Sequence, residues 1–156
     1  MDNPLAKKLL IRPANHVLVR NPPPDFLIKL QPLPEGAKVS TDGEGLFDVV
    51  LQFVYNKTEV DAQALDALRR ARNQGVVWMI YPKRSKTVQT DINRDSGWDV
   101  LWDAGWVGIG IVAIDKAWAG LRFRLASQVK RKPDSIFLKS TFHSVEAWKV
   151  PTAAVG

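Results

Sequence analysis

The sequence predicts a single α/β domain with a mainly parallel sheet flanked by helices and ending in an antiparallel edge hairpin. Two nearly continuous apolar segments, 48–54 and 76–81, have the composition of strands covered on both faces. A helical pattern separates them, and strand, helix and strand at this spacing form a parallel unit with a right-handed crossover. Over 121–125, apolar residues alternate with arginines, which indicates a half-exposed, antiparallel edge strand.

The elements of the first third follow from cap and breaker residues. Asn3 and Pro4 open a short helix over about 5–11, and a buried strand follows over 16–20. The prolines at 22–24 end that strand. A short helix then runs over about 26–30, and a weak strand lies near 37–40.

The later elements follow from periodicity. Thr58 and Asp61 resemble a capping arrangement at the start of a helix that ends near residue 72. Ser96 caps a short helix that ends at Gly105. A strand over 107–114 and a turn over 115–120, which contains Trp118, lead to the last strand.

These elements define the domain organisation. We expect one domain over residues 1–127, since 156 residues bury a core without disulfides or metals. We expect residues 128–156 to be a basic C-terminal extension that is packed on the domain or partly ordered.

Composition narrows the classes of function. The chain has no cysteine, which excludes disulfides and thiolate chemistry and fits a reducing compartment. No apolar run approaches the ~20 residues of a membrane span, and no secretory signal pattern is present, so we expect a cytoplasmic protein. Lys and Arg number 22 against 16 Asp and Glu, and the net charge of +6 permits a polyanionic partner. The basic residues gather at 7–12, 83–86 and 130–132.

Motifs for the common chemistries are missing from the sequence. His16 and His143 are the only histidines, and their spacing does not form a metal motif. Neither a Gly-x-Ser-x-Gly elbow nor a phosphate-binding loop occurs. The sequence therefore predicts no metal and no catalytic residues.

Four segments carry a resemblance to known proteins. They are Asp48-Val49-Val50-Leu51, Gly75-Val76-Val77-Trp78, Tyr81-Pro82-Lys83 and Trp118-Ala119-Gly120-Leu121-Arg122. On these the chain resembles a family of small bacterial proteins of unknown function with a methyltransferase-like, Rossmann-like layout. The element order over 48–125 is similar to a truncated, degenerate class I S-adenosylmethionine-dependent methyltransferase domain. The resemblance implies the fold.

The same resemblance bears on cofactors. In those methyltransferases a Gly-rich turn follows the first strand, and an acidic residue follows the second. Here Asn21 and the three prolines stand at the first place, without glycine and with three backbone donors missing. Asp42 or Glu44 stands nearest to the second. We therefore expect no cofactor. If the chain does bind one, the resemblance implies S-adenosylmethionine.

Candidate ligand-binding residues follow from the position of the strand ends. In open α/β sheets, ligands bind beyond the carboxyl ends of the strands, where the strand order reverses. The residues placed there, or in the loops beside it, are Asn21, Tyr55, Asn56, Tyr81, Lys83, Arg94, Asp95 and Trp118. The alternatives without ligand binding are a local ion pair for Arg94 and Asp95 and a core or interface position for Trp118.

The functional prediction is a non-catalytic α/β module that binds a partner protein or a small anionic ligand, so we lean against an enzyme. Two alternatives stay open. The first is a divergent S-adenosylmethionine-dependent methyltransferase-like enzyme, and the second is a nucleic-acid-binding protein with its basic clusters on one face. A homodimer through a strand edge or through residues 128–156 is also compatible with the sequence.

Overall fold

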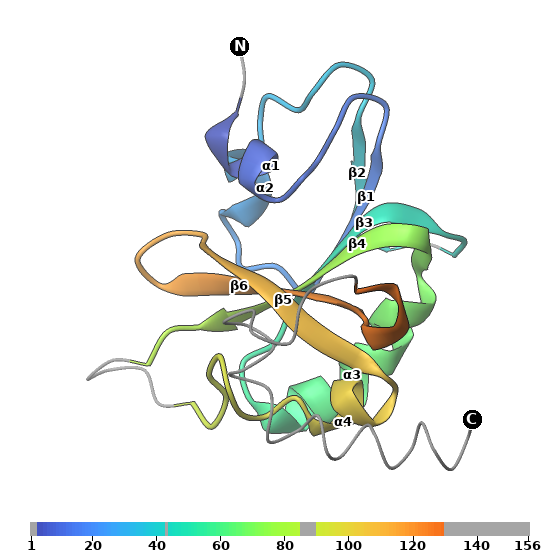
Figure 1. Cartoon of the computed structure of the whole chain (residues 1–156). Coiled ribbons are helices and arrows are strands. Elements are labelled where there is room, and N and C mark those ends of the chain that lie inside the picture. The colour runs from blue at the N-terminus through green and yellow to red at the C-terminus, as the bar shows by residue number, and fades with distance from the viewer. Residues whose placement is uncertain (1–2, 43, 85–89, 130–156) are drawn as a thin grey trace.

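A six-stranded mixed sheet with two helices on each face organises the chain (Figure 1). The computed structural model describes residues 3–42, 44–84 and 90–129. The elements in chain order are α1 (Pro4–Lys8), β1 (His16–Arg20), α2 (Phe26–Lys29), β2 (Lys38–Ser40), β3 (Phe47–Phe53), α3 (Lys57–Arg69), β4 (Ala71–Pro82), α4 (Asp99–Asp103), β5 (Trp106–Ala113), β6 (Trp118–Leu125) and a short 3-10 helix (Ala126–Gln128). The predicted extension at 128–156 lies almost entirely outside the described residues.

The strand order is β2-β1-β3-β4-β6-β5. The first four strands are parallel, and β6 is antiparallel to both of its neighbours, so the predicted fold class is confirmed. One detail differs from the prediction: β6 lies between β4 and β5, and β5 is the edge strand. The alternation in β6 arises because Leu121 and Phe123 are buried beneath α3 and α4, whereas Arg122 and Arg124 point to the other face.

The two faces of the sheet bury separate cores. On one face, α1 and α2 cover β1, β3 and β4, and Trp78 donates its indole N–H to the backbone oxygen of Leu9 at 3.0 Å. On the other face, α3 and α4 cover a core that includes Trp98 and Trp102. Both indoles are buried in this core.

Two helix starts differ from the prediction. Asn56, not Thr58, caps α3, because its Oδ1 accepts a hydrogen bond from the backbone N–H of Glu59 at 2.9 Å. The Glu59 carboxylate in turn accepts from the backbone N–H of Tyr55 at 2.8 Å, which completes a reciprocal cap two residues earlier than expected. In α4 the cap position is Trp98, two residues after the predicted Ser96.

The strand order reverses between β1 and β3. From β1 the chain moves to β2 on one side, and from β3 it moves to β4 on the other. The link from β2 to β3 is short, and its described residues form no helix. On this face of the sheet, α3 is therefore the helix that lies next to the carboxyl ends of β1 and β2. The reversal of strand order at the carboxyl ends of the strands is the place where an open α/β sheet binds its ligand.

Candidate functional site

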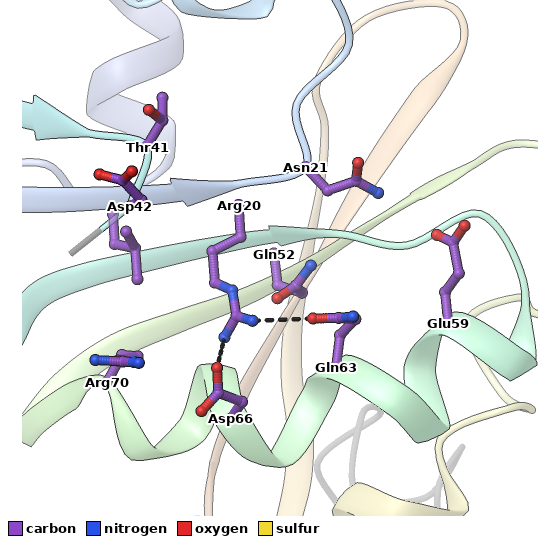
Figure 2. Close-up of a pocket in the computed structure, with 10 residues that line it drawn as sticks. Arg20, Asn21, Thr41, Asp42, Gln52, Glu59, Gln63, Asp66 and Arg70 are labelled. Carbon is purple, nitrogen blue, oxygen red and sulfur yellow. Dashed lines mark hydrogen bonds and ion pairs between the residues drawn. The ribbon is translucent and has the colours of Figure 1, made fainter. Parts of the chain in front are cut away.

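An open polar cavity lies at this reversal of strand order, between α3 and the β2-β1-β3 part of the sheet (Figure 2). Its volume is about 510 Å³, within the ~300–1,000 Å³ that small-molecule sites occupy. We call it the switch-point cavity. It is lined by Leu18, Arg20, Asn21, Thr41, Asp42, Gln52, Glu59, Gln63, Asp66 and Arg70.

One wall of the switch-point cavity is a polar stripe on α3. Glu59, Gln63, Asp66 and Arg70 follow one another at spacings of four, three and four residues, so they share one side of the helix. The apolar side of α3 packs against the sheet instead. Because α3 is amphipathic, its row of polar side chains lies toward the carboxyl ends of β1 and β2.

Arg20, the last residue of β1, ties the sheet to that stripe. Its Nη1 lies 2.8 Å from Oδ2 of Asp66, and its Nη2 donates to Oε1 of Gln63 at 2.9 Å (Figure 2). The Arg20 side chain is only 19% exposed, which makes this ion pair less screened by solvent than a surface pair. Arg20 therefore links the end of β1 to the polar stripe of α3.

Gln52 supplies a buried polar group at the base of the cavity. It is 1% exposed and is the only buried polar or charged residue in the described part of the chain. Its Nε2 donates to the backbone oxygen of Phe53 at 3.0 Å, and this fixes the orientation of the amide. Its Oε1 is buried and has no hydrogen-bond partner within the described residues. An unpaired buried acceptor costs about 1–3 kcal/mol, which a hydrogen-bond donor on a ligand would recover.

Asn21 turns the chain at the end of β1. Its φ is +58°, the left-handed conformation that glycine, asparagine and aspartate adopt most readily. The turn therefore has the backbone form that a glycine would give. The prolines at 22–24 that follow have no backbone N–H to offer a ligand, so donors at this edge must come from side chains.

Two further charged side chains at the cavity are free to bind. Asp42 follows β2, is exposed, and forms no ion pair or hydrogen bond with another described residue. The Arg70 guanidinium likewise forms no ion pair within residues 3–42, 44–84 and 90–129. The cavity thus presents acceptors at Asp42 and Gln52 and donors at Asn21 and Arg70. This set suits recognition of a polar ligand, and no histidine lines it.

The structure separates the predicted site residues. Asn21 alone lines the switch-point cavity, and Asn56 is occupied as the cap of α3. Tyr55 and Trp118 lie beside each other, with ring centroids 5.1 Å apart in an edge-to-face contact. Trp118 is half-buried and begins β6 instead of lying in the preceding turn.

The remaining predicted residues lie at the end of β4 and in the loop after it. Tyr81 is 5% exposed and packs edge-on against Trp98, and its burial raises its pKa to about 12. The Nζ of Lys83 donates to the backbone oxygen of Asp115 at 2.9 Å, which ties β4 to the turn before β6. Arg94 and Asp95 form an exposed ion pair at 3.4 Å.

A second hollow lies on the α2 side, between the proline turn and the turn at 115–117. Its volume is about 440 Å³, and Trp118 and Phe26 form part of its lining. Lys29 and Asp115 close one side of it through a 2.7 Å ion pair. Burial raises the pKa of Asp115, but hydrogen bonds from Lys29 and two backbone N–H groups outweigh burial and lower it. Two of the four charged side chains that line this hollow, Lys29 and Asp115, are therefore already paired.

The described residues were also compared with the requirements of a metal site and of a membrane-spanning helix. Among them, no three His, Asp or Glu side chains are grouped so that they could hold a metal ion. None of the helices in this part of the chain has the length and apolar character needed to cross a membrane.

Comparison with known proteins identifies the fold. No protein-family model matches the chain, and no curated protein matches its sequence. One similar solved structure is a ribosomal protein L11 methylase from Lactobacillus delbrueckii subsp. bulgaricus, with a TM-score of 0.54 and 12% identity over 78% of this chain and 74% of that one. Another is DhpI in complex with SAH, with a TM-score of 0.51 and 12% identity over 80% of this chain and 84% of that one. The chain therefore has a methyltransferase-like α/β fold, as the sequence resemblance implied.

Proposed function

We propose that this protein binds an adenosyl ligand of the S-adenosylmethionine class in the switch-point cavity, as a divergent methyltransferase-like protein. The observation that carries the proposal is an open polar cavity at the reversal of strand order in a methyltransferase-like fold. A similar structure holds SAH, which makes adenosyl compounds the first ligands to test.

The side chains of the cavity match the polar groups of such a ligand. Asp42 is a free carboxylate next to β2 and can accept hydrogen bonds from ribose hydroxyls. Gln52 offers an unpaired amide oxygen to an amino group. Arg70 and Asn21 can donate to a carboxylate, which replaces the backbone donors that the proline turn lacks.

A thermal-shift titration of the full chain with S-adenosylmethionine and S-adenosylhomocysteine tests the proposal. A ligand that binds only the native state stabilises it by ~2.7 kcal/mol at a hundredfold excess over its Kd. For a chain of this size that corresponds to a melting-temperature rise of roughly 5–10 °C. Asp42→Asn should reduce the rise, whereas Asp103→Asn, an exposed carboxylate at the end of α4, should leave it unchanged. No rise with either ligand at millimolar concentration would overturn the proposal.

A second candidate function is ligand binding without catalysis, which is close to the original prediction. The lining of the switch-point cavity favours this second function, because the lining holds no histidine. His16 lies at the opposite end of β1, where its Nε2 contacts Ser40 Oγ at 2.8 Å. A saturable thermal shift without consumption of S-adenosylmethionine in the presence of cell extract would support this candidate. Measured methyl transfer that Asp42→Asn abolishes would support the enzyme.

A further inference from the structure

Three arginines gather on the α1 side of the sheet, away from the switch-point cavity. Arg122 and Arg124 are two residues apart on β6, so their side chains leave the same face, about 7 Å apart along the strand. Arg122 pairs with Trp78 of β4, whose indole binds the Leu9 oxygen at the end of α1. Arg12 follows Ile11, which is buried in the core on this face, and it is near enough to Arg122 for its charge to act on that guanidinium.

No acidic residue balances this cluster within the described chain. Across residues 3–42, 44–84 and 90–129, no carboxylate forms an ion pair with Arg12, Arg122 or Arg124. Arg124 donates only to an amide, Oε1 of Gln74, at 2.8 Å. Three positive charges therefore share one surface without a counter-charge from the described residues.

Arg122 is the constrained member of the cluster. Its side chain is half-buried, and its Nε is buried without a hydrogen-bond partner among the described residues. Burial lowers the pKa of Arg122, and the charges of Arg124 and Arg12 lower it further. The residue opposite it on β5 is Gly110, where a side chain would meet open space. A bound anion would fit in the open space at Gly110. It would offset the repulsion between the arginine charges and accept a hydrogen bond from Nε of Arg122.

The spacing of the arginines suits an extended anion, because Arg122 and Arg124 follow one another along the strand. Neither the switch-point cavity nor the hollow beside Trp118 is lined by any of the three arginines. Lys8 prolongs the row, because its Nζ approaches the backbone oxygen of Ala113 at the end of β5 at 3.5 Å. Guanidinium groups match phosphate in geometry, and a chain carrying a net charge of +6 attracts polyanions over a distance.

We propose that Arg12, Arg122 and Arg124 form a binding site for the phosphodiester groups of a nucleic-acid strand. The site is independent of the proposed adenosyl ligand, because it lies on the opposite face of the sheet. Arg12 of this site belongs to the predicted basic cluster at 7–12. The predicted cluster at 130–132 lies outside the described residues.

Fluorescence anisotropy with a dye-labelled single-stranded oligonucleotide of mixed sequence tests the site, on the full chain over a series of salt concentrations. Affinity should fall steeply as salt rises. The double variant Arg12→Gln with Arg124→Gln should bind at least about tenfold more weakly, with a salt slope smaller by about 2. Arg69→Gln is the matched control, since this arginine lies on α3, on the opposite face, and its side chain is 72% exposed. It should change the affinity less than about twofold.

Arg122→Gln separates binding from folding. Because it removes a half-buried charge from like neighbours, it should keep or raise the melting temperature while it weakens oligonucleotide binding. The proposal is overturned if wild type does not bind the oligonucleotide at low salt, or if the double variant and Arg69→Gln lose affinity equally. It is also overturned if inorganic pyrophosphate binds through these arginines and the oligonucleotide does not. The thermal shift with S-adenosylhomocysteine should be the same in all these variants.

Discussion

Replacement of Gln52 by methionine is a direct test of the buried amide at the base of the switch-point cavity. Methionine has nearly the same length and removes both polar atoms. The loss of the Nε2 bond to the backbone oxygen of Phe53 costs about 1 kcal/mol, and removal of the unpaired Oε1 recovers about 1–3 kcal/mol. The net expectation is that Gln52→Met raises the free energy of unfolding by about 1 kcal/mol, or the melting temperature by roughly 2–4 °C.

Thermal unfolding of the ligand-free protein measures this effect. Gln63→Met is the control, because Gln63 accepts a hydrogen bond from Arg20 and is not unpaired. That variant should lose up to about 1 kcal/mol of stability. A fall in the melting temperature for Gln52→Met as large as that of the control would contradict the unpaired state of Oε1, because it would mean that this atom has a structural partner. A rise in stability together with a smaller shift on addition of S-adenosylhomocysteine would mark Gln52 as a ligand-binding residue whose burial costs stability.

Three further substitutions test a helix cap, a glycine turn and a buried tyrosine. Asn56→Ala removes the side-chain cap of α3 and should lower the free energy of unfolding by about 1 kcal/mol, measured by urea denaturation. Gly97→Ala should lower it by more than about 2 kcal/mol in the same assay, because φ is +100° and the new methyl group would collide with the side chain of Ile92. In a Tyr55→Phe variant the only tyrosine left is Tyr81, and its absorbance titration should have a midpoint near pH 12; a midpoint near pH 10 would contradict its burial. Because the folded-state pKa is raised from 10.0 to about 12, the contribution of Tyr81 to stability is fully present well below pH 10, and about 2 kcal/mol of it should be lost as pH rises from 10 to 12.

Much of the fold could be predicted because its strands have strong local patterns. The apolar segments of β3 and β4 and the helix between them follow directly from periodicity. The position of β6 could not be predicted in this way, because alternation reports one covered face and not the identity of the neighbouring strands. The antiparallel strand could pair on either side of β5, and burial of Leu121 and Phe123 beneath α3 and α4 determines the side.

The candidate site was harder to predict, because its position depends on how α3 faces the sheet. Asn21 could be placed from the end of β1, whereas Asn56, also predicted to bind a ligand, caps α3 in the structure. Two signals for the cavity are nevertheless present in the sequence. Gln52 is the only polar residue inside an otherwise apolar strand end, and the polar residues of α3 recur at helical spacing.

The most direct measurement is a crystal structure of the full chain grown with S-adenosylhomocysteine. We expect electron density for the ligand in the switch-point cavity, with a donor of the ligand within hydrogen-bond distance of Gln52 Oε1 and a hydroxyl close to Asp42. Ligand density in the hollow beside Trp118, or an empty switch-point cavity in crystals grown at saturating ligand, would contradict it.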